Sequence, residues 1–192
     1  MTNSLGAALA AVDEANKLDP NHINGQPRAL EQGRLATAWL GRLAADPSPE
    51  LQLAARAHHL ERWVLERSSY PEGRAGYLRW RRENKAHQAA RAREIASTHA
   101  PSLSGGRLEQ LLLRRNLSGD TETQLLEDIA CLVFVETQFD DLAARLERDH
   151  LVTIVQRTLT KMSPEAIAAA SSVDLSANAS SVLDDAVASI GS

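Results

Sequence analysis

The chain has 192 residues, of which 43% are hydrophobic and 24% charged, and its formal net charge is −4. These values are typical of one globular domain with its own core, and a second full domain is not expected. No apolar run approaches the roughly 18 to 20 residues that span a bilayer, so we expect a soluble protein without a membrane segment. Cys131 is the only cysteine, which excludes an internal disulfide and a zinc cage of thiolates, and we expect it to be a small core residue.

The charge is distributed unevenly along the chain. Residues 56–93 contain ten Lys or Arg against four Asp or Glu, a local balance of +6, so the rest of the chain sums to −10. A general nucleic-acid binder usually has a basic balance over its whole domain, and nucleic acid is therefore not the expected partner. A basic segment within an acidic protein fits a pocket for a small anion. A solvated helix face would give the same pattern.

The N-terminus resembles a helix more than a targeting segment. It has no basic region, and Asp13 and Glu14 stand where a signal peptide would still be apolar. We interpret this segment as the first helix of the mature protein. Together with the single cysteine, it predicts a protein that folds in the reducing cytoplasm.

Helical spacing of apolar residues continues along the chain. Residues 30–45 form one such pattern, which ends at the sequence DPSP. The next helix is expected to start near Ser48, with Pro49 in its first turn, and to run to about residue 69. The residues of the segment 70–73, Tyr-Pro-Glu-Gly, predict a turn.

The second half of the chain has the same character. Helices are predicted at about residues 74–98, 104–115, 120–147 and 150–161, with no convincing strand pattern. The expected fold is therefore all-α, with residues 1–164 as a single compact multi-helix domain. Small and polar residues dominate residues 165–192, which indicates a C-terminal helix or a partly mobile tail.

Asp128 is a carboxylate on an otherwise apolar helix face. At 100° per residue it falls within about 60° of the centre of the buried face of the helix predicted over 120–147. A buried carboxylate must be paired, hydrogen-bonded, bound to metal or neutral. Asp128 is thus a candidate metal ligand. The alternative is an Asp that pairs with a core Arg or caps a neighbouring helix.

His58 and His59 are adjacent, so their side chains point about 100° apart and reach one ion only if it lies beside the helix between them. Imidazole is a common ligand of zinc and iron. Most such pairs, however, have one ring in the core and one in solvent. Arg62 follows His58 by four residues and shares its face. His87 shares a helical stripe with Trp80 and Asn84, and Glu31 lies one turn from Leu35 on an apolar helix face. Four successive helical units thus offer a candidate constellation of Glu31, His58, His59, His87 and Asp128.

Three segments carry a resemblance to a known family. They are RAHHLERW at residues 56–63, SSYPEGRAGYLRWRRENKAH at residues 68–87 and TQLLEDIACLVF at residues 123–134. The chain resembles, over residues 11–164, the domain of unknown function family 4202. The signature YPxGRxGYxxWR at residues 70–81 is specific. This resemblance implies membership but supplies no reaction.

A weaker resemblance is to the HD-domain superfamily of metal-dependent phosphohydrolases, which are all-helical. In that superfamily a first helix carries H-x-x-R-V, a second carries consecutive His-Asp, a later helix offers further histidines and a downstream helix supplies the last Asp. Residues 31–35 look like the first element with Glu in place of His, and residues 53–59 look like the second with His in place of Asp. His87 and Asp128 would be the third and fourth. The two changed ligands indicate a site retuned to another ion or emptied of metal.

The HD-domain resemblance implies a mechanism and a set of site residues. A divalent ion (Zn, Mn or Fe) would make hydroxide available at neutral pH. Its ligands would be Glu31, His58, His59 and Asp128, with His87 as a further candidate. Cationic side chains would hold the phosphoryl oxygens, and these are Arg62, Arg74, Arg79, Arg82 and Lys85. Tyr77 or Trp80 would stack on a base or sugar, unless these rings pack in the core.

Three classes of function remain open from the sequence. The first is a phosphohydrolase that acts on a nucleotide or another small phosphate ester. The second is a binding module for an anion or nucleotide that holds no catalytic metal. The third is a helical interaction protein, or a di-iron oxygenase on the same scaffold. The metal content of the purified protein discriminates between them.

Overall fold

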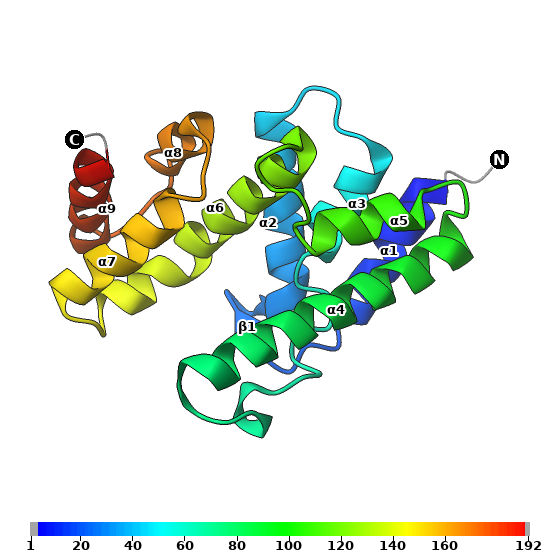
Figure 1. The fold of residues 1–192 in the computed structure, drawn as a ribbon, viewed down its shortest axis with the longest axis horizontal. Helices are drawn as coiled ribbons and strands as arrows, with labels where there is room; N and C mark the ends of the chain where they lie inside the picture. Colours follow the sequence, from blue (N-terminus) through cyan, green and yellow to red (C-terminus); the bar gives the residue numbers. More distant parts are fainter. Residues whose placement is uncertain (1–3, 191–192) are drawn as a thin grey trace. The chain divides into compact units, whose positions relative to one another are not determined.

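A computed structural model describes residues 4–190, and it confirms the all-α class (Figure 1). The chain forms two compact units, one that ends at Leu126 and one that begins at Glu127, within a continuous helix. The predicted domain boundary after residue 164 coincides with the start of a helix inside the second unit. In the described residues, no helix combines the length and the apolar character that crossing a membrane requires.

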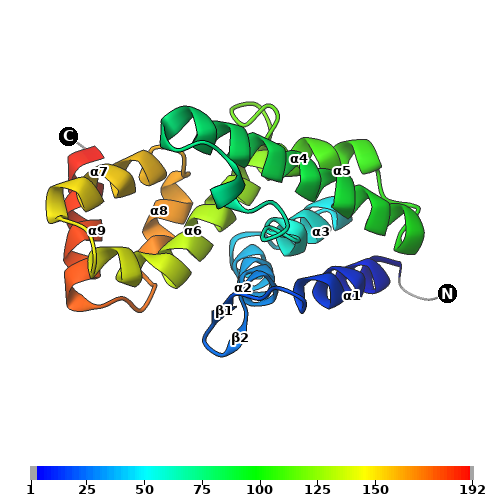
Figure 2. The same cartoon turned by 90° about the horizontal axis from the view of Figure 1, so that it is seen from below.

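The first unit contains a short hairpin and a set of packed helices. Its elements are α1 (Ser4–Asn16), β1 (His22–Ile23), β2 (Gln26–Pro27), α2 (Arg28–Leu43), α3 (Pro49–Ala57), the 3₁₀ turn η1 (Arg67–Ser69), α4 (Gly73–His99), α5 (Gly105–Leu112) and the start of α6 (Thr121–Ala143). α4 packs against α1 and α5, and α3 packs against α2 and α5 (Figures 1 and 2). The core of this unit is therefore enclosed by helices distant in sequence.

The start of α3 follows from a local signal. Ser48 is the N-cap, its Oγ accepts a hydrogen bond from the Leu51 N–H at 3.1 Å, and Pro49 occupies the first helical position. A side-chain oxygen at the N-cap accepts a hydrogen bond from an N–H of the first turn that has no partner within the helix. Proline suits the first helical position because it has no backbone N–H of its own that would need a partner. The predicted helix start is confirmed.

The predicted end of the same helix is wrong. α3 ends at Ala57 rather than near residue 69, and Glu61 adopts a left-handed backbone conformation with φ of 50°. Its N–H donates to Asn16 Oδ1 at 3.2 Å. Side chains of α4 satisfy the carbonyls released from the helix, because Asn84 Nδ2 donates to the Arg62 and Leu65 oxygens and Trp80 Nε1 donates to the Leu65 oxygen. Residues 58–66, named the histidine loop below, therefore form an irregular segment held by side chains of α1 and α4.

The hairpin was not predicted. β1 and β2 pair antiparallel with His22 opposite Pro27, and the turn residues Asn24 and Gly25 have φ of 52° and 73°. Such angles define a type I′ turn, for which Asn-Gly is the preferred sequence. The hairpin returns the chain to its start, where the Arg28 N–H donates to the Asn21 oxygen at 2.8 Å. It thereby fixes the position at which α2 begins.

The second unit contains the rest of α6 with α7 (Arg148–Leu159), α8 (Pro164–Ala170) and α9 (Ala177–Ile190). α7 packs against α9, and Val182, Leu183 and Ala186 of α9 are buried. The residues that were predicted to form a C-terminal helix or a partly mobile tail thus include two helices. Cys131 is buried on α6, as predicted.

Candidate functional site

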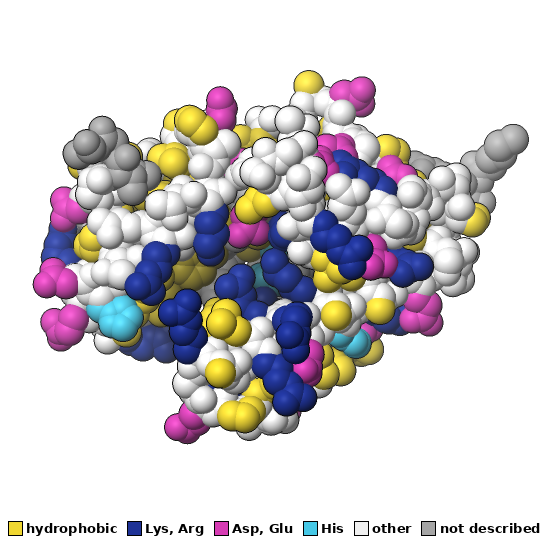
Figure 3. Space-filling view, in the orientation of Figure 1, with side chains coloured by type: hydrophobic (Ala, Val, Ile, Leu, Met, Phe, Trp, Pro, Cys, Tyr) yellow, Lys and Arg dark blue, Asp and Glu magenta, His cyan; other side chains and the backbone are white. Residues whose placement is uncertain are grey.

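A cavity of about 480 Å³ opens in the first unit where the start of α2, the histidine loop, η1 and α4 meet. Small-molecule sites generally range from about 300 to 1,000 Å³. Figure 3 shows Lys and Arg side chains gathered over the N-terminal half of α4. The residues that line the cavity are Asp19, Pro20, Asn21, Arg28, Ala29, Gln32, Arg62, Trp63, Leu65, Glu66, Arg67, Ser68 and Trp80.

Arg62 is the central cation of this cavity. It is half-buried, and its guanidinium carbon lies 4.9 Å from the centre of the Trp80 ring. Burial lowers the pKa of Arg62, and the positive charges of Arg81 and Arg28 lower it further, against an opposing effect of Tyr77. In the described residues, no Asp or Glu forms an ion pair with Arg62. The positive charge of Arg62 is therefore partly shielded from water without an ion pair, although the carboxylates of Asp19 and Glu66 line the same cavity.

The two adjacent histidines have fixed orientations. His58 is buried, and its Nδ1 lies 3.0 Å from the Ala55 oxygen, whereas His59 Nδ1 lies 2.7 Å from Gln32 Oε1. The rings are stacked with their centroids 4.1 Å apart. Because both acceptors are oxygens without a proton, Nδ1 of each ring carries the hydrogen, and in the neutral ring Nε2 carries the lone pair.

The charge state of His59 follows from its surroundings. Burial lowers its pKa well below the usual value, and the charges of His58, Arg62, Arg114 and Arg28 lower it further. A histidine with a strongly lowered pKa is neutral at pH 7. His59 therefore adds a base with a lone pair, and not another positive charge, beside Arg62.

The predicted metal ligands do not form a cluster in the part of the chain that the structure describes. No group of three or more His, Cys, Asp or Glu side chains there is placed to hold a metal ion. His58 and His59 are brought together, but His87 Nε2 lies 3.3 Å from Glu61 Oε2. Glu31 lies half-buried on α2.

Asp128 belongs to the second unit. Its Oδ1 accepts a hydrogen bond from the Ser163 N–H at 2.9 Å, and Ser163 is the N-cap of α8. The carboxylate thus holds the start of a neighbouring helix, which agrees with the alternative interpretation of this residue.

Of the cations predicted to hold phosphate, Arg62 lines the cavity. Arg74 and Arg82 are exposed on α4, and Arg79 is exposed and pairs with Glu83 at 2.8 Å. Lys85 is half-buried on the same helix. Two arginines that were not predicted, Arg28 and Arg67, contribute to the cavity in their place.

Of the two aromatic residues predicted to stack on a base or sugar, one is buried and the other is partly exposed. Trp80 is buried, and its Nε1 donates to the Leu65 oxygen at 2.7 Å, so it packs in the core and supports Arg62. Tyr77 is 43% exposed and its ring lies 5.9 Å from that of Trp80. Trp63, which was not among the predicted site residues, lines the cavity.

The chain belongs to the family described as Domain of unknown function (DUF4202), because the family model matches residues 6–183. The predicted membership is confirmed. No curated protein and no solved structure matches the chain. The resemblance to the HD-domain superfamily remains a prediction from the residue pattern.

Proposed function

We propose that the first unit binds a small phosphorylated molecule in the cavity beside Arg62. The observation that carries this proposal is the guanidinium of Arg62, which is half-buried, rests on Trp80 and has no ion pair with a carboxylate of the described residues. A cation held away from water is costly unless an anion or hydrogen bonds compensate for it. A phosphate group bound in the cavity would supply that compensation.

The neighbouring side chains support a phosphate ligand in particular. Arg28 and Arg67 line the same cavity, and Arg67 uses one nitrogen to donate to the Tyr70 oxygen at 3.0 Å, which holds its side chain in place. Guanidinium groups match the geometry of phosphate oxygens through paired hydrogen bonds. The lining carries these three guanidinium groups and two carboxylates, those of Asp19 and Glu66, so its formal charge is three minus two, or +1, which favours an anionic ligand.

The first prediction is that a phosphorylated compound stabilises the protein and that Arg62→Ala removes the effect. At a hundredfold excess over Kd, a ligand bound only by the native state stabilises it by about 2.7 kcal/mol. Thermal unfolding should be followed by tryptophan fluorescence with phosphate, pyrophosphate, sulfate and a panel of nucleotides. Since Trp39, Trp63 and Trp80 all belong to the first unit, the signal reports on the unit that holds the cavity.

Arg79→Ala is the matched control for this experiment. Arg79 is a cation of the same type on α4, but its side chain is 63% exposed and paired with Glu83. We expect it to keep the full ligand-induced shift, and Arg62→Lys to keep a part of it. Equal shifts in Arg62→Ala and wild type, or equal effects of every salt at one ionic strength, would contradict the proposal.

Hydrolysis of the bound phosphate is a second candidate function, favoured by the orientation of the two histidines. Metal-bound histidines typically donate their second ring N–H to an oxygen acceptor, as Nδ1 of His58 and His59 do toward Ala55 and Gln32. A zinc, manganese or iron ion held through Nε2 would supply an activated water. Two imidazoles are, however, one ligand short of the three protein ligands usual in a catalytic zinc site.

Metal analysis of the purified protein separates the two candidates. For the hydrolase we expect close to one zinc, manganese or iron per chain, lost in His59→Ala but kept in Arg62→Ala, because the arginine is no ligand. Phosphate release from nucleotides should follow the metal content. A protein that contains no metal, and that releases no phosphate when these ions are added, would be a binding module alone, and iron with oxygen uptake would indicate an oxygenase.

A further inference from the structure

We infer that the phosphorylated ligand of the cavity is a nucleotide, whose base stacks on Trp63 while Arg62 binds its phosphate. This inference rests on the proposed function and specifies the chemical class of the ligand. It depends on the difference between Trp63 and the other two tryptophans of the chain.

Trp39 and Trp80 are already engaged by the protein. Trp39 is 3% exposed and has the guanidinium of Arg42 4.0 Å from its ring centre. Trp80 donates its N–H to the Leu65 oxygen and carries the guanidinium of Arg62 over its ring. Both rings therefore serve packing and the placement of cations.

Trp63 is placed differently. It is half-buried in the histidine loop and lines the cavity, and within the described residues no other aromatic ring and no Lys or Arg stacks on it. A tryptophan that keeps part of its apolar surface open to a cavity gains by covering it with a flat ligand group. The cavity thus combines an aromatic surface with a cluster of guanidinium groups.

The residue proposed to bind the phosphate and the residue proposed to stack on the base are neighbours in the chain. Trp63 directly follows Arg62, and both line the cavity with Arg28 and Arg67. A nucleotide presents a flat base and a charged phosphate a short distance apart. Stacking of a base on an aromatic side chain contributes about 1–3 kcal/mol and tolerates every base, because each base has a π-face. We therefore expect a nucleotide to bind better than its sugar phosphate, with little preference between purine and pyrimidine.

The test compares AMP, UMP, ribose 5-phosphate and inorganic phosphate in equilibrium titrations with the full chain. The wild type should bind AMP and UMP about tenfold more tightly than ribose 5-phosphate. Trp63→Leu should remove this difference and leave the affinity for ribose 5-phosphate unchanged, whereas Trp63→Phe should keep a part of it. Arg62→Ala should weaken the binding of all four compounds.

Each alternative outcome has a separate meaning. The inference is wrong if AMP binds no better than ribose 5-phosphate, or if Trp63→Leu weakens the binding of both compounds equally. In either case Trp63 lines the cavity without binding a base, and the proposed phosphate site is not contradicted. If Arg62→Ala changes none of the affinities, or if no phosphorylated compound binds, the proposed function fails as well. Circular dichroism and the melting temperature of each variant show that it is folded.

Discussion

Replacing Gly76 by Ala is expected to lower the free energy of unfolding of the first unit by about 3 kcal/mol or more. A Cβ atom at this position would lie 1.8 Å from the Pro71 oxygen, far inside any possible contact. The 70–73 turn cannot move away freely, since Arg67 donates to the Tyr70 oxygen and the Tyr70 hydroxyl donates to Glu83. Urea unfolding, followed by tryptophan fluorescence, measures the change.

Gly106→Ala is the matched control for this substitution. Gly106 is exposed in α5, and a Cβ atom added there meets nothing within 4 Å. Alanine loses less backbone freedom on folding than glycine, so we expect this variant to be unchanged or more stable by up to about 1 kcal/mol. Equal stability of the two variants would show that the Pro71 oxygen does not exclude a Cβ atom at position 76.

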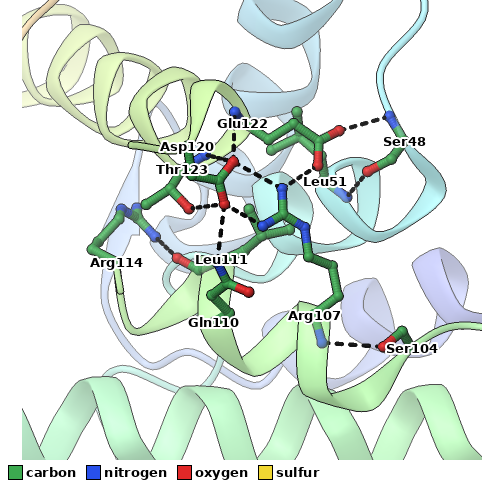
Figure 4. Close-up of polar contacts among 10 residues, drawn as sticks. All are labelled: Ser48, Leu51, Ser104, Arg107, Gln110, Leu111, Arg114, Asp120, Glu122 and Thr123. Atoms are coloured by element: carbon green, nitrogen blue, oxygen red, sulfur yellow. Dashed lines mark hydrogen bonds and ion pairs between the residues drawn. The ribbon is translucent and has the colours of Figure 1, made fainter. Parts of the chain in front are cut away.

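The second large effect is expected from Asp120→Asn, because Asp120 is the centre of a polar network (Figure 4). Arg107 contacts Asp120 through two nitrogens and donates to Glu122 Oε2 at 2.6 Å. The Thr123 hydroxyl and the Glu122 N–H also donate to Asp120. The side chains of Arg107 and Asp120 are only 26% and 12% exposed. We therefore expect a loss of about 2–3 kcal/mol at pH 7, since the variant leaves a largely buried cation without its main partner.

The same network predicts how this difference depends on pH. Hydrogen bonds from Arg107 hold the pKa of Asp120 well below its usual range, and the pKa of Glu122 is lowered by hydrogen bonds from Ser48 and Arg107 in spite of burial, which acts in the opposite direction. A carboxylate whose pKa is lowered by folding stabilises the folded state at any pH above its pKa in the unfolded chain, which is about 4. This stabilisation is lost as the pH falls from there through the pKa of the folded state. The wild type should thus lose its advantage over Asp120→Asn progressively below about pH 4.

Asp141→Asn controls for the substitution itself. Asp141 pairs with Arg145 at 3.7 Å, but its side chain is 79% exposed, so removing its charge should change the stability by no more than about 0.5 kcal/mol. Because Asp141 belongs to the second unit, circular dichroism is measured beside the fluorescence. A difference between wild type and Asp120→Asn that is equally large at pH 3 and pH 7 would contradict the ionic origin of the effect.

Local signals in the sequence account for the elements that were predicted well. Ser48 followed by Pro49 marks the start of α3 through backbone chemistry that involves a few neighbouring residues. The end of α3 could not be predicted in this way. Asn16 and Asn84, which hold the histidine loop, come from helices distant in sequence, and a helical pattern continued through the loop. The Asn24-Gly25 pair is a local signal for the hairpin, because this sequence favours a type I′ turn.

The candidate site could also be predicted only in part, because elements distant in sequence bring some of its residues together. Arg62 was predicted because of its place after His58, whereas Arg28 reaches the cavity through the hairpin and Arg67 through η1. The basic residues Arg74 and Arg82 belong to an exposed face of α4, which was the alternative interpretation of the charged segment. A count of charges along the chain does not distinguish a cavity from a helix surface. Only the packing of the elements does so.

Calorimetric titration with the phosphorylated compound that gives the largest thermal shift tests the central claim most directly. We expect one molecule bound per chain, an affinity that falls as salt is added, and a loss of about tenfold or more in Arg62→Ala, since hydrogen bonds to a charged group contribute about 1.5–3 kcal/mol. Arg79→Ala should titrate like the wild type. Identical binding by Arg62→Ala and wild type, or a loss in Arg79→Ala that Arg62→Ala does not show, would mean that the cavity beside Arg62 is not the binding site.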